Sequence, residues 1–434
     1  REVSDALGET HWYLRLLRDE RAAAERMARV LASSRFATGL LLRAPEAVRL
    51  LATEGAPELS TRESLEEEVA AGVARHRDPE VAISVVRAMR RRELFRISVA
   101  DLGAEVGVGP QTDATLPVEQ VGAAVTAVSA ATVSGALQVA RRAVGEKVEF
   151  AVVAMGRLGG HEMSYASDAD VMYVHRAPEG MDESTGLALA LRIAQEMHRL
   201  LALPSPEPSL MLDADLRPEG RSGPLVRSLA SYQAYYARWG EVWERQALLR
   251  AEPLAGSPDL LAAVRALVDP LRWPEGGITD DEVREIRRIK ARVESERLPR
   301  GVDRSRHLKL GPGGLADVEW VIQLLQLQHA AGVPALRTTR TVPALRAAAE
   351  ADLVSAEDAA TLLEAWRLAG EIRYAIVHAS GRGGEVFPTD ARTRESVARI
   401  LGYPPGGTGR LLEDWARATR RARRVVRRLF YGET

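Results

Sequence analysis

The chain of 434 residues contains no cysteine, so it has neither a disulfide framework nor a thiolate metal site. Lysine is nearly absent as well, occurring only at Lys147, Lys290 and Lys309. Arginine and alanine are both abundant, which we interpret as a composition bias, and arginine clusters are therefore weak binding signals. The formal net charge of −1 gives no general attraction to nucleic acid or to a membrane. An anion-binding surface has to be local.

Long hydrophobic runs are rare, and one uncharged run, Val121–Ala140, approaches the length of a membrane span. It consists mainly of small residues and carries Gln138, so it is much less apolar than a leucine-rich span. We predict a buried helix here. With no signal peptide and no cysteine, we expect a cytoplasmic protein without a membrane anchor. The chain does not begin with Met, which favours a processed chain or a fragment.

Helical patterns dominate the first 145 residues. The spacing of Ser60 and Glu63 is that of a capping box ahead of a helix. A second helix is predicted over Val81–Leu102, with the arginines from Arg90 to Arg92 on a solvated face. The Gly- and Pro-containing segment Gly107–Pro117 is predicted to be a linker.

Strand patterns appear between about residues 147 and 256, and helical patterns return after residue 270, with a capping box at Thr279–Glu282. The last helix carries many arginines, predicted to be a solvated face or, alternatively, a surface for docking onto an acidic protein. The expected fold class is α+β, a mostly helical chain with a small mixed sheet and a C-terminal helical bundle. The predicted domains are 1–110 (helical), 111–265 (catalytic, with a leading helix) and 266–434 (helical, regulatory or substrate-docking).

The most informative stretch is Phe150–His175, in which a buried strand, a glycine-rich turn and a second strand follow one another. Asp168 and Asp170 stand two residues apart at the head of the second strand, so both carboxylates project to one face. Two solvated acids are the simple interpretation. The glycine-rich turn just upstream favours a cation site beside an anion site, because backbone amides can approach an anion where Cβ atoms are missing.

A third strand is predicted over Leu210–Leu216, with Asp213 and Asp215 on one face. A carboxylate from a neighbouring strand would complete a site for two Mg²⁺ ions, which prefer oxygen ligands. We assign this place to Asp213, which could also accept a proton from an attacking hydroxyl, and keep Asp215 as the alternative.

Several residues are candidates for binding the phosphates of a nucleoside triphosphate. Gly159 and Gly160 would expose backbone amides, with Arg157 or Arg217 as charge partners. A second glycine-rich turn with Lys309 leads into a predicted helix over Leu315–Ala331, whose N-terminus would favour an anion. The acids at its start, Asp317 and Glu319, could instead complement the helix dipole. The turn after Met155 lacks the G-x-G-x-x-G spacing of dinucleotide-binding folds, and no Walker loop or H-E-x-x-H pair occurs.

The run from Gly156 to Asp170, GRLGGHEMSYASDAD, resembles the signature of glutamine synthetase adenylyltransferase, a family of the DNA polymerase β-like nucleotidyltransferase superfamily. Further matching segments are Arg90–Leu94 (RRREL), Arg217–Gly220 (RPEG), Trp243–Leu248 (WERQAL) and Lys309–Glu319 (KLGPGGLADVE).

The resemblance implies a polymerase β-like core, with Asp168, Asp170 and Asp213 as metal ligands and catalytic residues. Ser167 and Lys309, which lie in the matching segments, join the candidate nucleotide-binding set. Members of the family resemble two such halves in tandem, one attaching AMP to glutamine synthetase from ATP and one removing it by phosphorolysis. The residues of the motif, GRLGGHEM followed by SDAD, resemble those of the C-terminal, attaching half more closely than those of the removing half.

The expected partners are therefore glutamine synthetase, a PII-type nitrogen signal protein and the AMP-removing half of a longer chain. The removing activity itself is one alternative, and a helical regulatory scaffold that has lost its chemistry is another. Transfer to an RNA end is disfavoured by the near-neutral net charge.

Overall fold

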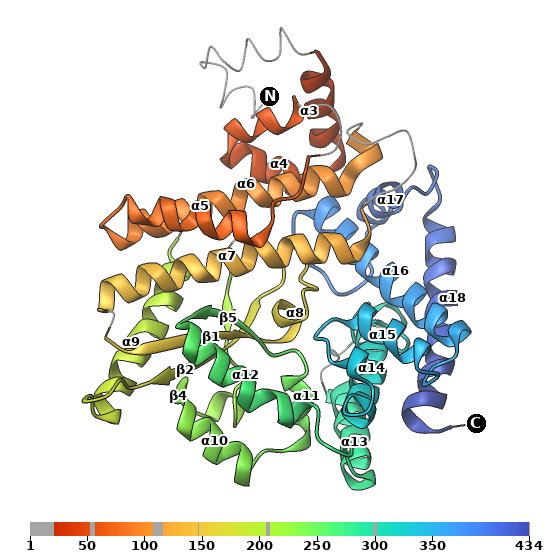
Figure 1. Cartoon of the computed structure of the whole chain (residues 1–434). Helices are drawn as coiled ribbons and strands as arrows, with labels where there is room; N and C mark the ends of the chain where they lie inside the picture. Colours follow the sequence, from red (N-terminus) through yellow and green to blue (C-terminus); the bar gives the residue numbers. More distant parts are fainter. Residues whose placement is uncertain are drawn as a thin grey trace.

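The computed structural model describes residues 21–52, 57–106, 116–145, 147–204, 209–296, 298, 301 and 303–433. Most of the predicted linker Gly107–Pro117 lies outside the described residues. The first helices are α3 (Arg21–Ser33), α4 (Arg35–Arg43), the 3-10 helix η1 (Pro45–Leu51), α5 (Arg62–Ala74), α6 (Pro79–Val106) and α7 (Val118–Val144). Figure 1 shows α5, α6 and α7 lying side by side above the sheet.

Two expectations for the N-terminal helices are wrong in detail. The N-cap of α5 is Thr61, whose side chain accepts the N–H of Ser64 at 3.3 Å, whereas the Ser60 hydroxyl donates to Glu93 on α6. The arginine face of α6 is only partly solvated, because Arg90 is 4% exposed whereas the Arg92 side chain is 32% exposed. Burial and the neighbouring charge of Arg87 lower the pKa of Arg90 to about 10.

The apolar helix α7 is a core element, as predicted. By length and composition α7 could cross a membrane, but 78% of its most apolar window is buried inside the protein. One face of α7 packs on α5 and α6, and the other contacts β5 and α9. Its small residues permit close approach, since a Cβ at Gly135 would overlap side-chain atoms of Val69 and Val86.

The sheet has five strands in the described part of the chain: β1 (Glu149–Ala154), β2 (Ala169–Arg176), β3 (Leu212–Asp213), β4 (Val226–Ser228) and β5 (Glu252–Gly256). Its order is β3-β2-β1-β5, and β4 pairs with the far end of β2. Strand β1 is antiparallel to β2 and β5, whereas β3 and β4 are parallel to β2. The expected α+β class with a small mixed sheet is confirmed.

Both faces of the sheet are buried, which explains the nearly continuous apolar character of β1. Phe150 and Val152 belong to the main core with α7 and α9, while Ala151 and Val153 belong to a second core under α10 and α12 (Figure 1). The helices around the sheet are α8 (Gly156–Gly159), α9 (Glu183–Ala202), the 3-10 helix η2 (Gly220–Ser222), α10 (Leu229–Arg238), α11 (Val242–Leu248) and α12 (Pro258–Arg272).

The C-terminal part is helical, as predicted. Its elements are α13 (Asp280–Glu296), η3 (Arg304–Arg306), α14 (Leu315–His329), η4 (Pro334–Leu336), α15 (Thr341–Glu350), α16 (Ala356–Ser380), α17 (Ala391–Ile400), α18 (Thr408–Val426) and the π-helical turn η5 (Arg427–Tyr431). The capping box before α13 is confirmed, since Thr279 and Glu282 exchange side-chain-to-backbone hydrogen bonds of 2.8 and 3.3 Å. Arg423 and Arg428 on the last helical segment form ion pairs with Asp317 and Asp358.

Candidate active site

Three carboxylates come together where the heads of β2 and β3 lie side by side. Asp170 and Asp213 are directly paired in the parallel ladder, and Asp168 stands two residues before Asp170. Parallel neighbours lie about 4.8 Å apart, so the two aspartates on adjacent strands are close neighbours. Strand β3 is only two residues long, much shorter than the predicted Leu210–Leu216, but it contains the residue that completes the group.

The electrostatics of these side chains reflect their closeness. Burial and the charge of Asp213 raise the pKa of Asp170 to about 6, against the opposing effect of Lys309. Burial and Asp213 also raise the pKa of Asp168, again opposed by Lys309. The three acids therefore share one electrostatic environment, in which like charges repel and one lysine offsets part of the repulsion.

Asp215 has a different environment from Asp213. Its carboxylate pairs with Arg221 and lies 3.8 Å from Arg217. Its backbone N–H donates to Oδ1 of Asp213 at 2.8 Å. Asp215 therefore lies in the turn after β3 and holds arginines, while Asp213 lies beside Asp170.

The glycine-rich turn forms the short helix α8, and its glycines are required by packing. A Cβ at Gly156, where φ is +51°, would overlap the carboxylate of Asp170. A Cβ at Gly159 would overlap the carbonyl oxygen of Arg250. The N–H groups of Gly159 and Gly160 donate to the carbonyls of Met155 and Gly156 at 2.9 and 3.0 Å. In the structure both N–H groups are therefore used in hydrogen bonds within the turn. Phosphate binding by these two amides stays a prediction.

The two arginines proposed as phosphate partners have protein partners. Arg157 donates to Glu319 on α14 at 2.6 Å. Arg217 is buried, and its guanidinium donates to backbone carbonyls, including those of Ala214 at 2.8 Å and Gly223 at 3.0 Å. The guanidinium groups of both residues are thus engaged by protein acceptors, and their role in phosphate binding stays a prediction.

Lys309 is the cation that the fold brings to the carboxylates from a distant part of the sequence. It precedes the turn before α14, its side chain is 41% exposed, and its charge lowers the pKa of both Asp168 and Asp170 against the other contributions. Glu385 is its ion-pair partner at 3.8 Å. Lys309 therefore lies close enough for its charge to act on Asp168 and Asp170, and its role in phosphate binding stays a prediction.

The acids at the start of α14 hold the Lys309 turn in place. Asp317 accepts the N–H of Gly313 at 2.7 Å and forms buried ion pairs with Lys290 and Arg423. Glu319 pairs with Arg157 and, at 3.8 Å, with Arg250. Both acids thus have partners from other elements, which adds a third interpretation to the two that the sequence left open. They join α13, α14 and α18 to α8.

The residues present fit a divalent cation in their chemistry. The donors are carboxylate oxygens, which suit Mg²⁺, and their mutual repulsion is what a bound cation would relieve. Within the described residues, however, no group of three or more His, Asp or Glu side chains converges closely enough to hold a metal ion in the present conformation. Ser167, the neighbouring candidate, uses its hydroxyl to accept the N–H of Ser164 at 2.9 Å.

Comparison with family models matches residues 24–266, more than half of the chain, to glutamate-ammonia ligase adenylyltransferase. The chain belongs to this family. A second model, described as GlnD PII-uridylyltransferase, matches residues 286–432.

Three relatives in this family share the printed name bifunctional glutamine synthetase adenylyltransferase/adenylyl-removing enzyme. The match to the Streptomyces avermitilis protein is 54% identical and covers 100% of this chain and 44% of the relative. For Streptomyces coelicolor the identity is 53% with the same coverage, and for Cutibacterium acnes it is 46%, covering 100% of this chain and 42% of the relative. The chain thus spans less than half the length of these adenylyltransferases.

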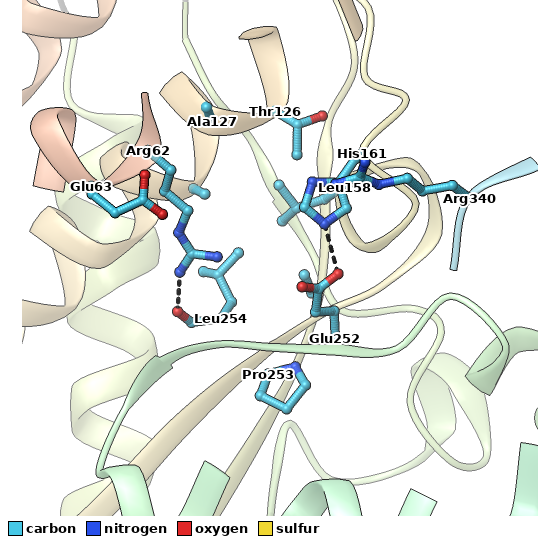
Figure 2. Close-up of a pocket in the computed structure, with 12 residues that line it drawn as sticks. Arg62, Glu63, Thr126, Ala127, Leu158, His161, Glu252, Pro253, Leu254 and Arg340 are labelled. Carbon is cyan, nitrogen blue, oxygen red and sulfur yellow. Dashed lines mark hydrogen bonds and ion pairs between the residues drawn. The ribbon is translucent and has the colours of Figure 1, made fainter. Parts of the chain in front are cut away.

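A pocket of about 300 Å³ is lined by residues of α5, α7, α8 and β5 and is separate from the three aspartates. Figure 2 shows His161 paired with Glu252 on one side of the pocket and Arg62 donating to the carbonyl of Leu254 on the other. The distance from Nε2 of His161 to Oε2 of Glu252 is 2.7 Å. None of the three aspartates lines this pocket. We therefore place the candidate active site of this family member at the heads of β2 and β3, and not in the pocket.

Sequence reasoning missed the buried ion network beneath α8. Arg250 pairs with Glu162 at 3.1 Å and donates to Thr341 at 2.6 Å, and Glu162 accepts the N–H of Thr341. Glu162 lies inside one matching segment and Arg250 just beyond another, which was the available signal for these two residues, whereas Thr341 lies outside the matching segments. Their pairing joins positions far apart in the sequence, so no local pattern could reveal it.

Proposed function

We propose that the chain is an adenylyltransferase that transfers AMP from ATP to a tyrosine hydroxyl of glutamine synthetase and releases pyrophosphate. The observation that carries the proposal is the cross-strand pair of Asp170 and Asp213, with Asp168 two residues away. Membership of the family supports the same reaction. Because the matched adenylyltransferases are more than twice as long, the activity of the whole protein comes to this chain only as a proposal.

The chemistry follows from the carboxylate set. The tyrosine oxygen forms a bond to the α-phosphorus, the bond from that phosphorus to the bridging oxygen breaks, and pyrophosphate leaves. Asp213 accepts the hydroxyl proton as the bond forms. Lys309 offsets negative charge on the triphosphate and on the acids around it.

Asp168, Asp170 and Asp213 would hold two Mg²⁺ ions, with the side chains drawn together on binding. When bound, such ions neutralise the triphosphate and stabilise the attacking and leaving oxygens. Arg157, Arg217 and Ser167 contribute by shaping the floor and rim of this site through their present protein contacts.

The second candidate is removal of AMP from glutamine synthetase by phosphorolysis. It is favoured by the name that the relatives share, which contains both activities, and by the partial coverage of each relative. Removal uses inorganic phosphate as the attacking group and releases ADP. Because this reaction also proceeds by attack on the phosphorus of AMP, the same carboxylates could serve it. If the chain attaches AMP, its expected partner is the AMP-removing half of a longer chain. The match to GlnD PII-uridylyltransferase supports a PII-type protein as a further partner.

A direct assay separates the two directions. The chain is incubated with Mg²⁺, glutamine synthetase and ATP labelled at the α-phosphate, and in parallel with adenylylated synthetase and phosphate. Label on the synthetase supports attachment, whereas ADP released only with phosphate supports removal. If neither product forms, Asp170→Asn is compared with the wild type for Mg²⁺-dependent ATP binding. If the wild type shows no Mg²⁺-dependent ATP binding that the variant could lose, the non-catalytic scaffold is the better interpretation. Binding of tRNA at low salt would reopen transfer to RNA.

A further inference from the structure

Tyr165 lies in the segment between α8 and β2, three residues before Asp168. Its side chain is buried, and its ring centroid lies 5.2 Å from that of Phe36 and 5.1 Å from that of His378. The hydroxyl donates to Oδ2 of Asp101 at 2.9 Å. Burial and the charge of Asp101 raise the pKa of Tyr165 well above its usual value, so the hydroxyl remains a donor.

A chain of buried hydrogen bonds continues from Asp101. The same Oδ2 accepts Nε2–H of His378 at 2.9 Å, because a carboxylate can only accept. Nδ1 of His378 is hydrogen-bonded in turn to the hydroxyl of Ser34 at 3.0 Å. Ser34 in turn caps α4 by accepting the N–H of Ala37 at 3.0 Å. One network therefore links α4, α6 and α16 to the segment that carries Asp168.

The order serine, histidine, aspartate resembles a hydrolase triad, but Ser34 is not placed to be a nucleophile. Ser34 and His378 are each only 1% exposed, so a substrate has no access to the serine oxygen. That oxygen also accepts the capping hydrogen bond from Ala37. The network therefore holds elements together.

The segment that Tyr165 belongs to is a turn closed by hydrogen bonds. Ser164 donates its N–H to Oγ of Ser167 at 2.9 Å, and the N–H of Ser167 donates to the carbonyl of Ser164 at 3.1 Å. On the outer side, Ala166 lies so close to Gly383, after α16, that a Cβ at Gly383 would be 2.7 Å from the Cβ of Ala166. A closed turn transmits the position of its anchor to the adjacent Asp168.

We propose that Tyr165 is a positioning residue for Asp168. Through Asp101 and His378 it fixes the turn Ser164–Ser167 against helices from both ends of the chain, so the carboxylates keep their arrangement only while α4, α6 and α16 are packed together. The effect on transfer rests on the proposed function, whereas the effect on the turn does not.

The test compares Tyr165→Phe with a matched control, Tyr403→Phe. Both changes remove a tyrosine hydroxyl that donates to an aspartate, Asp101 in one case and Asp414, at 2.8 Å, in the other. Tyr165→Phe keeps the buried ring, so the fold should survive. Two quantities are measured on the full chain, amide hydrogen exchange over residues 164–169 and the Mg²⁺ concentration that gives half-maximal transfer.

We expect Tyr165→Phe to speed exchange over residues 164–169 by about tenfold and to raise the Mg²⁺ requirement by about the same factor, as for one lost buried hydrogen bond to a charged group. Excess Mg²⁺ should restore most of the rate, which a general loss of fold would not allow. Tyr403→Phe should change neither quantity. Wild-type exchange over these residues in Tyr165→Phe would overturn the proposal. A wild-type chain without transfer would contradict the proposed function instead, and exchange alone would then decide the role of Tyr165.

Discussion

Asp170 and Asp213 lie side by side on the adjacent parallel strands β2 and β3, whereas Asp215 lies in the turn after β3 and pairs with Arg221. The period of two in a strand predicted that Asp168 and Asp170 share a face, and the same argument applied equally to Asp213 and Asp215. Only the register between the strands distinguishes the last two. That register depends on backbone pairing across about 40 residues of chain, which sequence periodicity does not contain.

The two acids should differ sharply on substitution. We expect Asp213→Asn to lower the rate of transfer by about 10² to 10⁴-fold, because it removes a proposed ligand and proton acceptor. Asp215→Asn should leave the rate within about fivefold, since Arg221 is 85% exposed and such an ion pair contributes little. Initial rates with labelled ATP decide this. Equal losses for both variants would contradict the assignment.

His175 on β2 gives a prediction about pH. Its side chain is 1% exposed, and in the described structure its buried Nδ1 has no hydrogen-bond partner. Burial lowers the pKa of His175 below 6.5, and Glu183, 3.8 Å away and exposed, opposes this only in part. The unfolded chain therefore binds more protons at this histidine than the folded chain does just below pH 6.5. The free energy of unfolding is unaffected by His175 above that pH and decreases as the pH falls below it.

His175→Leu removes the titrating group while keeping the strand apolar. Urea unfolding at about pH 7.5 and about pH 5 should show a larger loss of stability for the wild type than for the variant. The comparison between the two proteins cancels the other titrating groups. A variant that loses as much stability as the wild type on acidification would show that His175 does not carry this dependence.

Elements, in contrast to single contacts, were predictable where their pattern is long and periodic. The apolar helix α7 and the helices of the C-terminal part were confirmed. Short elements were not, because tertiary pairing decides their ends. Helices α10 and α11 are short elements of this kind, with 10 and 7 residues. The phosphate-binding interpretation of the glycine turn could not foresee that Arg157 has a partner, Glu319, on a helix more than 150 residues away.

The packing of α8 can be tested through its glycines. A Cβ at Gly159 would overlap the backbone carbonyl of Arg250, which cannot move without disturbing β5. We expect Gly159→Ala to lower the free energy of unfolding by about 3 kcal/mol, as for an overpacked core position. Gly409→Ala in α18 is the matched control, since no atom lies within 4 Å of the added Cβ. It should be neutral or stabilise by up to about 1 kcal/mol. Chemical denaturation of both variants gives the comparison.

At the scale of the whole molecule, one core joins parts of the chain that the sequence assigned to three domains. Buried residues from Met27 to Phe430 form a single continuous cluster, and a second, smaller cluster lies under α10 and α12. The ion pairs of Glu319 with Arg157 and Arg250 connect the C-terminal helices to α8 and to the turn before β5. The boundaries at about residues 110 and 265 stay a prediction, but contacts of this kind couple the regions energetically.

We therefore expect thermal unfolding in one transition, with coincident circular dichroism and tryptophan fluorescence curves and a calorimetric enthalpy near the van't Hoff value. Glu319→Gln should lower the temperature of this transition without dividing it, because leaving the mostly buried Arg157 without its charge partner costs about 3 kcal/mol, while Arg250 keeps its pair with Glu162. Glu364→Gln is the control, since its pair with Arg421 is exposed and contributes no more than about 1 kcal/mol. If the helices after residue 266 instead melt first as a separate step in the wild type, the buried ion pairs do not couple the regions, and the C-terminal part is an independent unit.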